Sequence, residues 1–198
     1  MKISSESLPK YQEVGLALFA SYSMSDSIHL ISKATEGTSK ELRSIIRYEF
    51  LFFRFFLIYF ILCENCGEKN IKNQIFNFFI STIYDRFAYN KKIEWLFDSP
   101  AELVETSRER LKVYIDILKI TLKETRDCEE DVSKKIVITF IFALRLLYPH
   151  IKIDEGTIPP SVLIIIKTEF NIFSEYINKL LKEKGLKYAE EYQSEKQA

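Results

Sequence analysis

Hydrophobic residues recur along the chain at intervals of three and four positions, which is the spacing of one face of an α-helix. The longest such stripe lies between residues 42 and 63 and consists of Leu42, Ile46, Glu49, Phe53, Phe56, Phe60 and Cys63. A second stripe predicts the buried side of a helix that starts near residue 100 and consists of Leu103, Leu111, Tyr114, Leu118 and Leu122. These patterns favour an all-helical fold.

Residues typical of helix ends divide the pattern into six or seven helices. Thr38 with Glu41, and Ser99 with Glu102, have the spacing of a capping box, and Pro100 suits a first helical position. Gly185 is typical of a helix end. The predicted helices span about residues 9–24, 25–35, 38–67, 69–89, 99 onward, 127–148 and 161–184.

Two nearly charge-free runs stand out, residues 50–63 and 136–148, and each contains one arginine, Arg54 or Arg145. Both are shorter than the ~20 apolar residues of a membrane-spanning helix. We therefore expect two central helices, covered on most sides by others. The predicted fold is a single all-α domain over residues 1–187, a bundle of six to seven helices, followed by a polar tail over residues 188–198.

The composition supports this fold and narrows the range of partners. Glycine and proline number 5 each in 198 residues, so few residues interrupt long helices. The formal net charge is zero and no segment is strongly basic, so a nucleic-acid partner is not favoured. Many Ile, Lys and Glu residues suit a thermophilic source or a low-GC genome. No secretory signal is visible at the N-terminus, so we expect a cytoplasmic protein.

A guanidinium inside an apolar run needs a partner or access to water. Three acidic residues lie close to apolar stripes: Glu49, Asp85 and Glu169. We expect Glu49 or Glu169 to pair with Arg54 or Arg145 and so to fix the register of neighbouring helices. The alternative is that these residues line a cleft.

The spacing of the cysteines and histidines does not favour a redox site or a zinc site. Cys63 and Cys66 form a C-x-x-C pair at the end of a predicted helix, where the helix dipole opposes a reactive thiolate. A zinc site would need further ligands, of which Cys128, His29 and His150 are the available ones. We interpret the pair as residues that close a helix, and we expect no metal and no cofactor.

Two short segments resemble known families. Arg145-Leu-Leu-Tyr-Pro-His150 is similar to the R-x4-H motif of HEPN ribonucleases, and this resemblance implies Arg145 and His150 as an RNA-cleaving pair. Residues 18–40 resemble the helix-turn-helix of TetR-type regulators, in LFA at 18–20, ISKA at 31–34 and Ser39-Lys40. That resemblance implies DNA binding.

The leading interpretation is a non-enzymatic helical protein that acts through self-association or through a protein partner. This interpretation is based on the large number of apolar residues, among them 16 Phe and 11 Tyr, which leaves more apolar surface than the other helices can cover. A homodimer would cover that surface. The DNA-binding regulator and the HEPN-like ribonuclease are the two alternatives.

Overall fold

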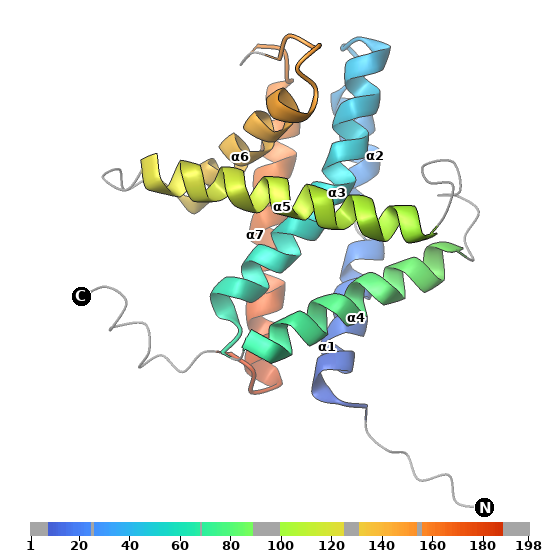
Figure 1. Cartoon of the computed structure of the whole chain (residues 1–198), viewed down its shortest axis with the longest axis vertical. Helices are drawn as coiled ribbons and strands as arrows, with labels where there is room; N and C mark the ends of the chain where they lie inside the picture. Colours follow the sequence, from blue (N-terminus) through green and yellow to red (C-terminus); the bar gives the residue numbers. More distant parts are fainter. Residues whose placement is uncertain are drawn as a thin grey trace, which may run out of the picture. The chain divides into compact units, whose positions relative to one another are not determined.

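The structure, a computed structural model, describes residues 8–24, 26–67, 69–88, 100–124, 131–153 and 156–187. These residues form seven helices and no β-strand, which confirms the predicted all-α class (Figure 1). The helices are α1 Lys10–Met24, α2 Ser27–Ala34, α3 Lys40–Asn65, α4 Lys69–Ala88, α5 Pro100–Glu124, α6 Val132–Leu147 and α7 Pro160–Glu183. None of these described helices has the length and apolar character that a membrane-spanning segment requires. The predicted tail, 188–198, and the Ser99 cap lie outside the described residues.

The start of α3 differs from the prediction by one residue. Ser39, rather than Thr38, caps the helix, because its hydroxyl accepts from the Leu42 amide at 3.2 Å. The Thr38 hydroxyl instead donates to the Thr35 carbonyl at 2.8 Å. The predicted capping box of Thr38 and Glu41 is therefore wrong, although α3 begins where the sequence indicates.

Two other helix ends have local caps, although α6 begins at Val132 rather than near residue 127 as predicted. The Asp131 side chain caps α6, since it accepts from the Ser133 amide at 3.0 Å. Gly185 follows α7 with a φ of 65°, a conformation in which glycine carries no steric penalty. The Leu186 amide donates to the Leu181 carbonyl at 2.8 Å and so closes the turn.

The packing of the chain divides into two compact units. The first contains α1, α4, the C-terminal part of α3, the start of α5 and the end of α7. The second contains α2, α6, the N-terminal part of α3 and most of α5 and α7. The bounds of 1–187 for a single domain stay a prediction.

In the first unit, α1 packs against α4, and Figure 1 shows the two helices crossing. Gly15 permits their close approach, because a Cβ there would stand 2.6 Å from a ring carbon of Phe78. The rings of Tyr22 and Phe79 meet edge to face at 5.7 Å. The end of α7 joins this pair, since the Tyr176 hydroxyl donates to the Ala17 carbonyl at 3.3 Å.

In the second unit, residues 50–58 of α3 are all buried. The Phe53 ring contacts Tyr114 of α5 at 5.1 Å and Phe140 of α6 at 4.9 Å between centroids. This part of the first apolar run is thus enclosed on all sides, as its composition predicts.

The second apolar run is less enclosed than expected. One side of α6 packs inside, with Ile136, Phe140 and Leu144 buried. On the other side, Phe142 is 46% exposed and Leu146 is 63% exposed. The predicted α5 stripe also ends early, because Leu122 is exposed and Thr121 takes the buried position. The structure therefore leaves apolar surface on the second unit in contact with solvent.

Candidate functional site

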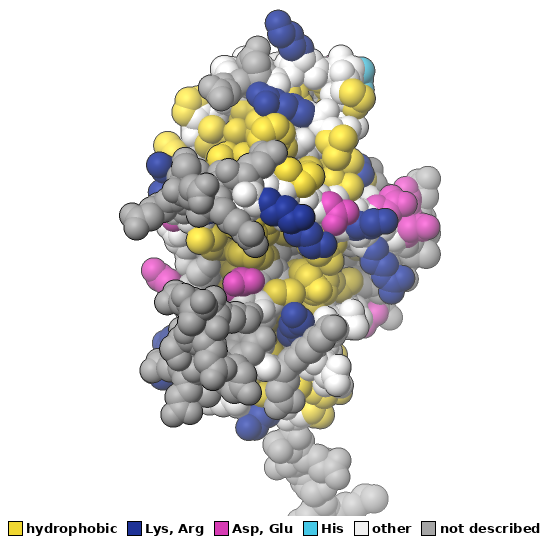
Figure 2. Space-filling view, turned by 60° about the vertical axis from the view of Figure 1, so that its left-hand side comes forward, with side chains coloured by type: hydrophobic (Ala, Val, Ile, Leu, Met, Phe, Trp, Pro, Cys, Tyr) yellow, Lys and Arg dark blue, Asp and Glu magenta, His cyan; other side chains and the backbone are white. Residues whose placement is uncertain are grey.

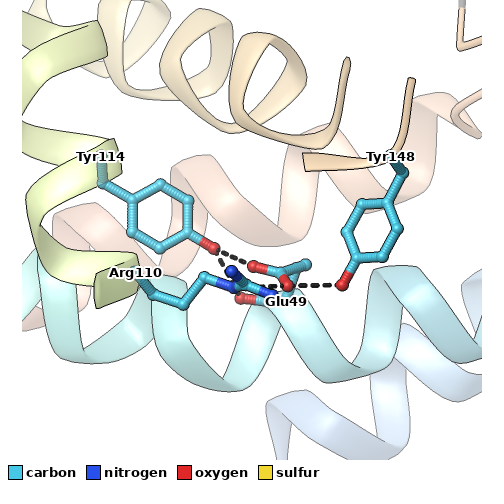
Figure 3. Close-up of polar contacts among 4 residues, drawn as sticks. All are labelled: Glu49, Arg110, Tyr114 and Tyr148. Atoms are coloured by element: carbon cyan, nitrogen blue, oxygen red, sulfur yellow. Dashed lines mark hydrogen bonds and ion pairs between the residues drawn. The ribbon is translucent and has the colours of Figure 1, made fainter. Parts of the chain in front are cut away.

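Glu49 lies at the centre of a buried polar cluster in the second unit (Figure 3). Its carboxylate accepts from Arg110 Nε at 2.8 Å and from the hydroxyls of Tyr114 and Tyr148 at 2.6 Å each. The donors come from α5 and from the end of α6, so the cluster joins three helices. Arg110 and Tyr148 are half-buried, whereas Tyr114 and Glu49 are buried. The Arg110 side chain is 19% exposed and that of Glu49 is 1% exposed.

This environment raises the pKa values of both tyrosines. Burial, and then the charge of Glu49, raise the pKa of Tyr114 well above its usual value. Burial and the hydrogen bond to Glu49 also raise the pKa of Tyr148. Both phenols therefore stay protonated and act as donors to a carboxylate that Arg110 neutralises. Such an arrangement ties three helices together, because donors from α5 and from the end of α6 meet one carboxylate of α3.

A second buried ion pair joins Arg54 to Glu169. Arg54 Nε lies 2.9 Å from Glu169 Oε2, and the two side chains are 1% and 6% exposed. The Ser27 hydroxyl donates to the other oxygen of Glu169, and the Arg54 guanidinium lies 5.5 Å from the Phe173 ring centroid. This pairing is one of those expected from the sequence, and it connects α2, α3 and α7 within the second unit.

Arg145 has a different environment from Arg54. Its Nε donates to the Ile153 carbonyl at 2.7 Å, and its guanidinium carbon lies 5.6 Å from the centroid of the Phe142 ring. Among the described residues no carboxylate forms an ion pair with it. Arg145 is half-exposed, so it belongs to the outer side of α6 rather than to a buried lock.

The other candidate residues do not converge on a site. His150 is 63% exposed and lies 3.7 Å from Glu41, while Arg145 contacts Ile153, so the two residues of the R-x4-H motif have separate partners. Asp85 is exposed on α4 and does not join a buried cluster. Cys63 is half-buried and Cys66 buried at the end of α3, and Cys128 lies outside the described residues. Within the described part of the chain, no three His, Cys, Asp or Glu residues are placed to hold a metal ion.

The segment that resembles a helix-turn-helix runs from α1 through α2 to the first residue of α3. α2 is a helix of 8 residues, and α3 continues without a break for 26 residues into the buried run. Arg43 on α3 contacts the carbonyls of Thr35 and Glu36 that end α2. This arginine therefore closes the turn between the two helices.

An open pocket of about 540 Å³ lies where the start of α3 meets the loop before α7. None of its described lining residues is ionisable; they include Ser39, Leu42, Thr157 and Pro159. The Ser39 hydroxyl is engaged as the cap of α3. The described lining of the pocket thus presents small polar and apolar groups.

The exposed apolar residues of the second unit form the more distinctive feature. On the face shown in Figure 2, hydrophobic side chains gather in patches with Lys and Arg side chains between them. Besides Phe142 and Leu146, α7 exposes Ile164 at 64% and Ile172 at 53%, and α2 exposes Leu30 at 47%. Lys167, one turn after Ile164, pairs with Asp131 at 3.1 Å and so links α7 to the N-terminal end of α6.

Comparisons with protein families, with curated proteins and with solved structures found no match to this chain.

Proposed function

We propose that this protein acts without catalysis, by associating with other protein chains and in the first place with a second copy of itself. The observation that carries the proposal is the outer side of α6, where Phe142 and Leu146 stand 46% and 63% exposed on consecutive turns. A helix of this composition is normally covered, because exposed apolar area carries a free-energy cost in water. A second copy would cover it.

The charge of the chain supports association between identical copies. The sequence carries 28 Lys and Arg against 28 Asp and Glu, so its formal net charge is zero. Two copies therefore meet without a large net repulsion, and proteins near zero charge associate more readily than strongly charged ones. The proposed setting is the cytoplasm, where reducing conditions keep cysteines such as Cys63 as thiols.

The expected affinity is modest. Burying the exposed parts of Phe142 and Leu146 on both copies would contribute about 1 to 2 kcal/mol per side chain. Association itself costs about 4 to 15 kcal/mol in lost translational and rotational freedom. Four such side chains alone do not clearly exceed that cost, so neighbouring apolar residues must also be buried, and we expect a Kd of about micromolar order.

Light scattering over a concentration series tests the proposal. We expect the weight-average mass to rise from monomer towards dimer between about 1 and 100 micromolar, the range set by the expected affinity. A mass that stays monomeric throughout this range would refute self-association.

A further inference from the structure

The C-terminal half of α6 presents a continuous apolar strip to solvent. Ile138, Ile141, Phe142, Arg145 and Leu146 follow one another at helical spacing on the side opposite Phe140 and Leu144. Ile138, Ile141 and Arg145 are half-exposed and the other two are exposed. Resting on the proposed self-association, we propose that two copies pair through this strip, with their α6 helices antiparallel and crossing near Phe142.

Arg145 holds Phe142, at the centre of the strip, in a fixed position before association. Its Nε is held by the Ile153 carbonyl at 2.7 Å, and its guanidinium lies over the Phe142 ring at 5.6 Å. The aromatic ring and the cation thus hold each other in place before any partner arrives. A side chain that is already ordered loses less conformational entropy on binding, which favours association.

Charges at the two ends of the strip decide the orientation of the two helices. α6 contains no acidic residue, and Lys134 is exposed at its N-terminal end. At the other end Glu41, 67% exposed, lies 3.7 Å from His150. Lys134 lies eight residues before Phe142, about 12 Å along the axis at the helical rise. His150 lies on the other side of Phe142, in the turn that follows the end of α6 at Leu147.

An antiparallel crossing at Phe142 therefore brings Lys134 of one copy towards Glu41 of the other. The same contact forms twice, as a two-fold symmetric interface requires. A parallel arrangement would instead place Lys134 opposite Lys134 and Arg145 opposite Arg145, which like charges disfavour. The surface around the strip thus carries both the cation, Lys134, and the anion, Glu41, that the contact needs. A second copy of this chain therefore complements it, and no other acidic partner is required.

Matched substitutions locate the interface. Leu146→Glu and Ile164→Glu replace residues of nearly equal exposure, 63% and 64%, on and off the strip. We expect Leu146→Glu to raise the dimer Kd about tenfold or more, because it would bury a carboxylate, and Ile164→Glu to change it less than about twofold. Sedimentation velocity gives the Kd, and far-UV circular dichroism confirms that both variants fold.

A charge exchange tests the antiparallel arrangement. Lys134→Glu and Glu41→Lys, each alone, should raise the Kd about five- to tenfold, because an attractive contact that occurs twice becomes repulsive. The double variant should return to within about twofold of the unmodified chain, as restored pairing predicts.

The outcomes separate the inference from the function on which it rests. A monomeric unmodified chain would refute self-association itself. A dimer whose Kd responds equally to Leu146→Glu and Ile164→Glu, or not at all, would overturn the α6 strip and leave self-association standing. Failure of the double charge exchange to restore the Kd would overturn the antiparallel arrangement.

Discussion

Arg54 of α3 and Glu169 of α7 form a buried ion pair, with 2.9 Å between Nε and Oε2 and side-chain exposures of 1% and 6%. Arg145, the other arginine inside an apolar run, contacts a backbone carbonyl and an exposed phenylalanine instead. The two arginines that look alike in the sequence therefore have different roles. Arg54 fixes the interior of the second unit, and Arg145 belongs to its surface.

Removing one member of the buried pair should destabilise the fold more than removing both. Arg54→Leu leaves Glu169 as an uncompensated buried charge, and we expect a loss of about 3 to 5 kcal/mol in the free energy of unfolding. The double variant Arg54→Leu, Glu169→Leu should recover most of this loss, since it buries no charge. Urea unfolding gives the free energy of unfolding of the unmodified chain, of Arg54→Leu and of the double variant. A double variant less stable than Arg54→Leu would contradict this account.

The Glu49 cluster should make the fold sensitive to alkaline pH. An ordinary tyrosine has a pKa of about 10, and the folded pKa values of Tyr114 and Tyr148 are raised above it. A raised pKa favours the protonated phenol in the fold, so this stability is fully present below about pH 10 and is lost as the pH rises through the folded values.

Phenolate absorbance during an alkaline titration measures this effect. Burial raises the pKa of Tyr59 and Tyr176 as well, so of the 11 tyrosines of the chain we expect at least four to ionise above the usual pH, with Tyr114 and Tyr148 ionising together with unfolding. Tyr148→Phe should remove one late-ionising group. Ionisation of every tyrosine near pH 10 with the fold intact would contradict the hydrogen bonds to Glu49.

Gly15 should resist even the smallest substitution. An added Cβ would meet Phe78 at 2.6 Å and the Ile75 carbonyl oxygen at 3.4 Å, so α1 or the Phe78 ring must shift. Overpacking costs about 1 to 3 kcal/mol, against about 1 kcal/mol gained in helix propensity, so Gly15→Ala should be destabilising. Gly37→Ala, with no atom within 4 Å of the new Cβ, is the matched control and should leave the melting temperature unchanged.

Asp131 should contribute to stability down to low pH. Hydrogen bonds from the Ser133 hydroxyl and amide, with Lys167 nearby, lower the pKa of Asp131 to about 2. Because this pKa is lower in the folded chain than in the unfolded chain, where it is about 4, the carboxylate stabilises the fold fully above about pH 4. This stabilisation is lost as the pH falls through the pKa of the folded chain.

Asp131→Asn isolates that contribution, because asparagine also caps a helix but does not titrate. The difference in melting temperature between the unmodified chain and Asp131→Asn should shrink from pH 5 to pH 2. A constant difference over this range would show that the carboxylate does not titrate as described.

The sequence predicts the helices well because their ends depend on local chemistry. Pro100 and Gly185 act over one turn, and each stands within two residues of an observed helix end. The burial of Glu49 also follows from its place in the α3 stripe. Its partners were not predicted, because they depend on which helices pack together.

Arg110 nevertheless left a signal in the sequence. It lies seven residues after Leu103 and four before Tyr114, on the buried side of α5, where an arginine calls for an acidic partner. By contrast, no feature of the sequence distinguishes the exposed side of α6 from its buried side. Ile136 and Phe140 on its buried side and Phe142 and Leu146 on its outer side are equally apolar, so composition does not distinguish them.

Mixing of isotope-labelled and unlabelled protein tests the central claim, association of the chain with its own copy, most directly. After equilibration at about 20 micromolar, a concentration above the expected Kd, native mass spectrometry should show light, mixed and heavy dimers in a ratio of about 1:2:1. A spectrum that contains the two monomers and no mixed dimer would contradict the account.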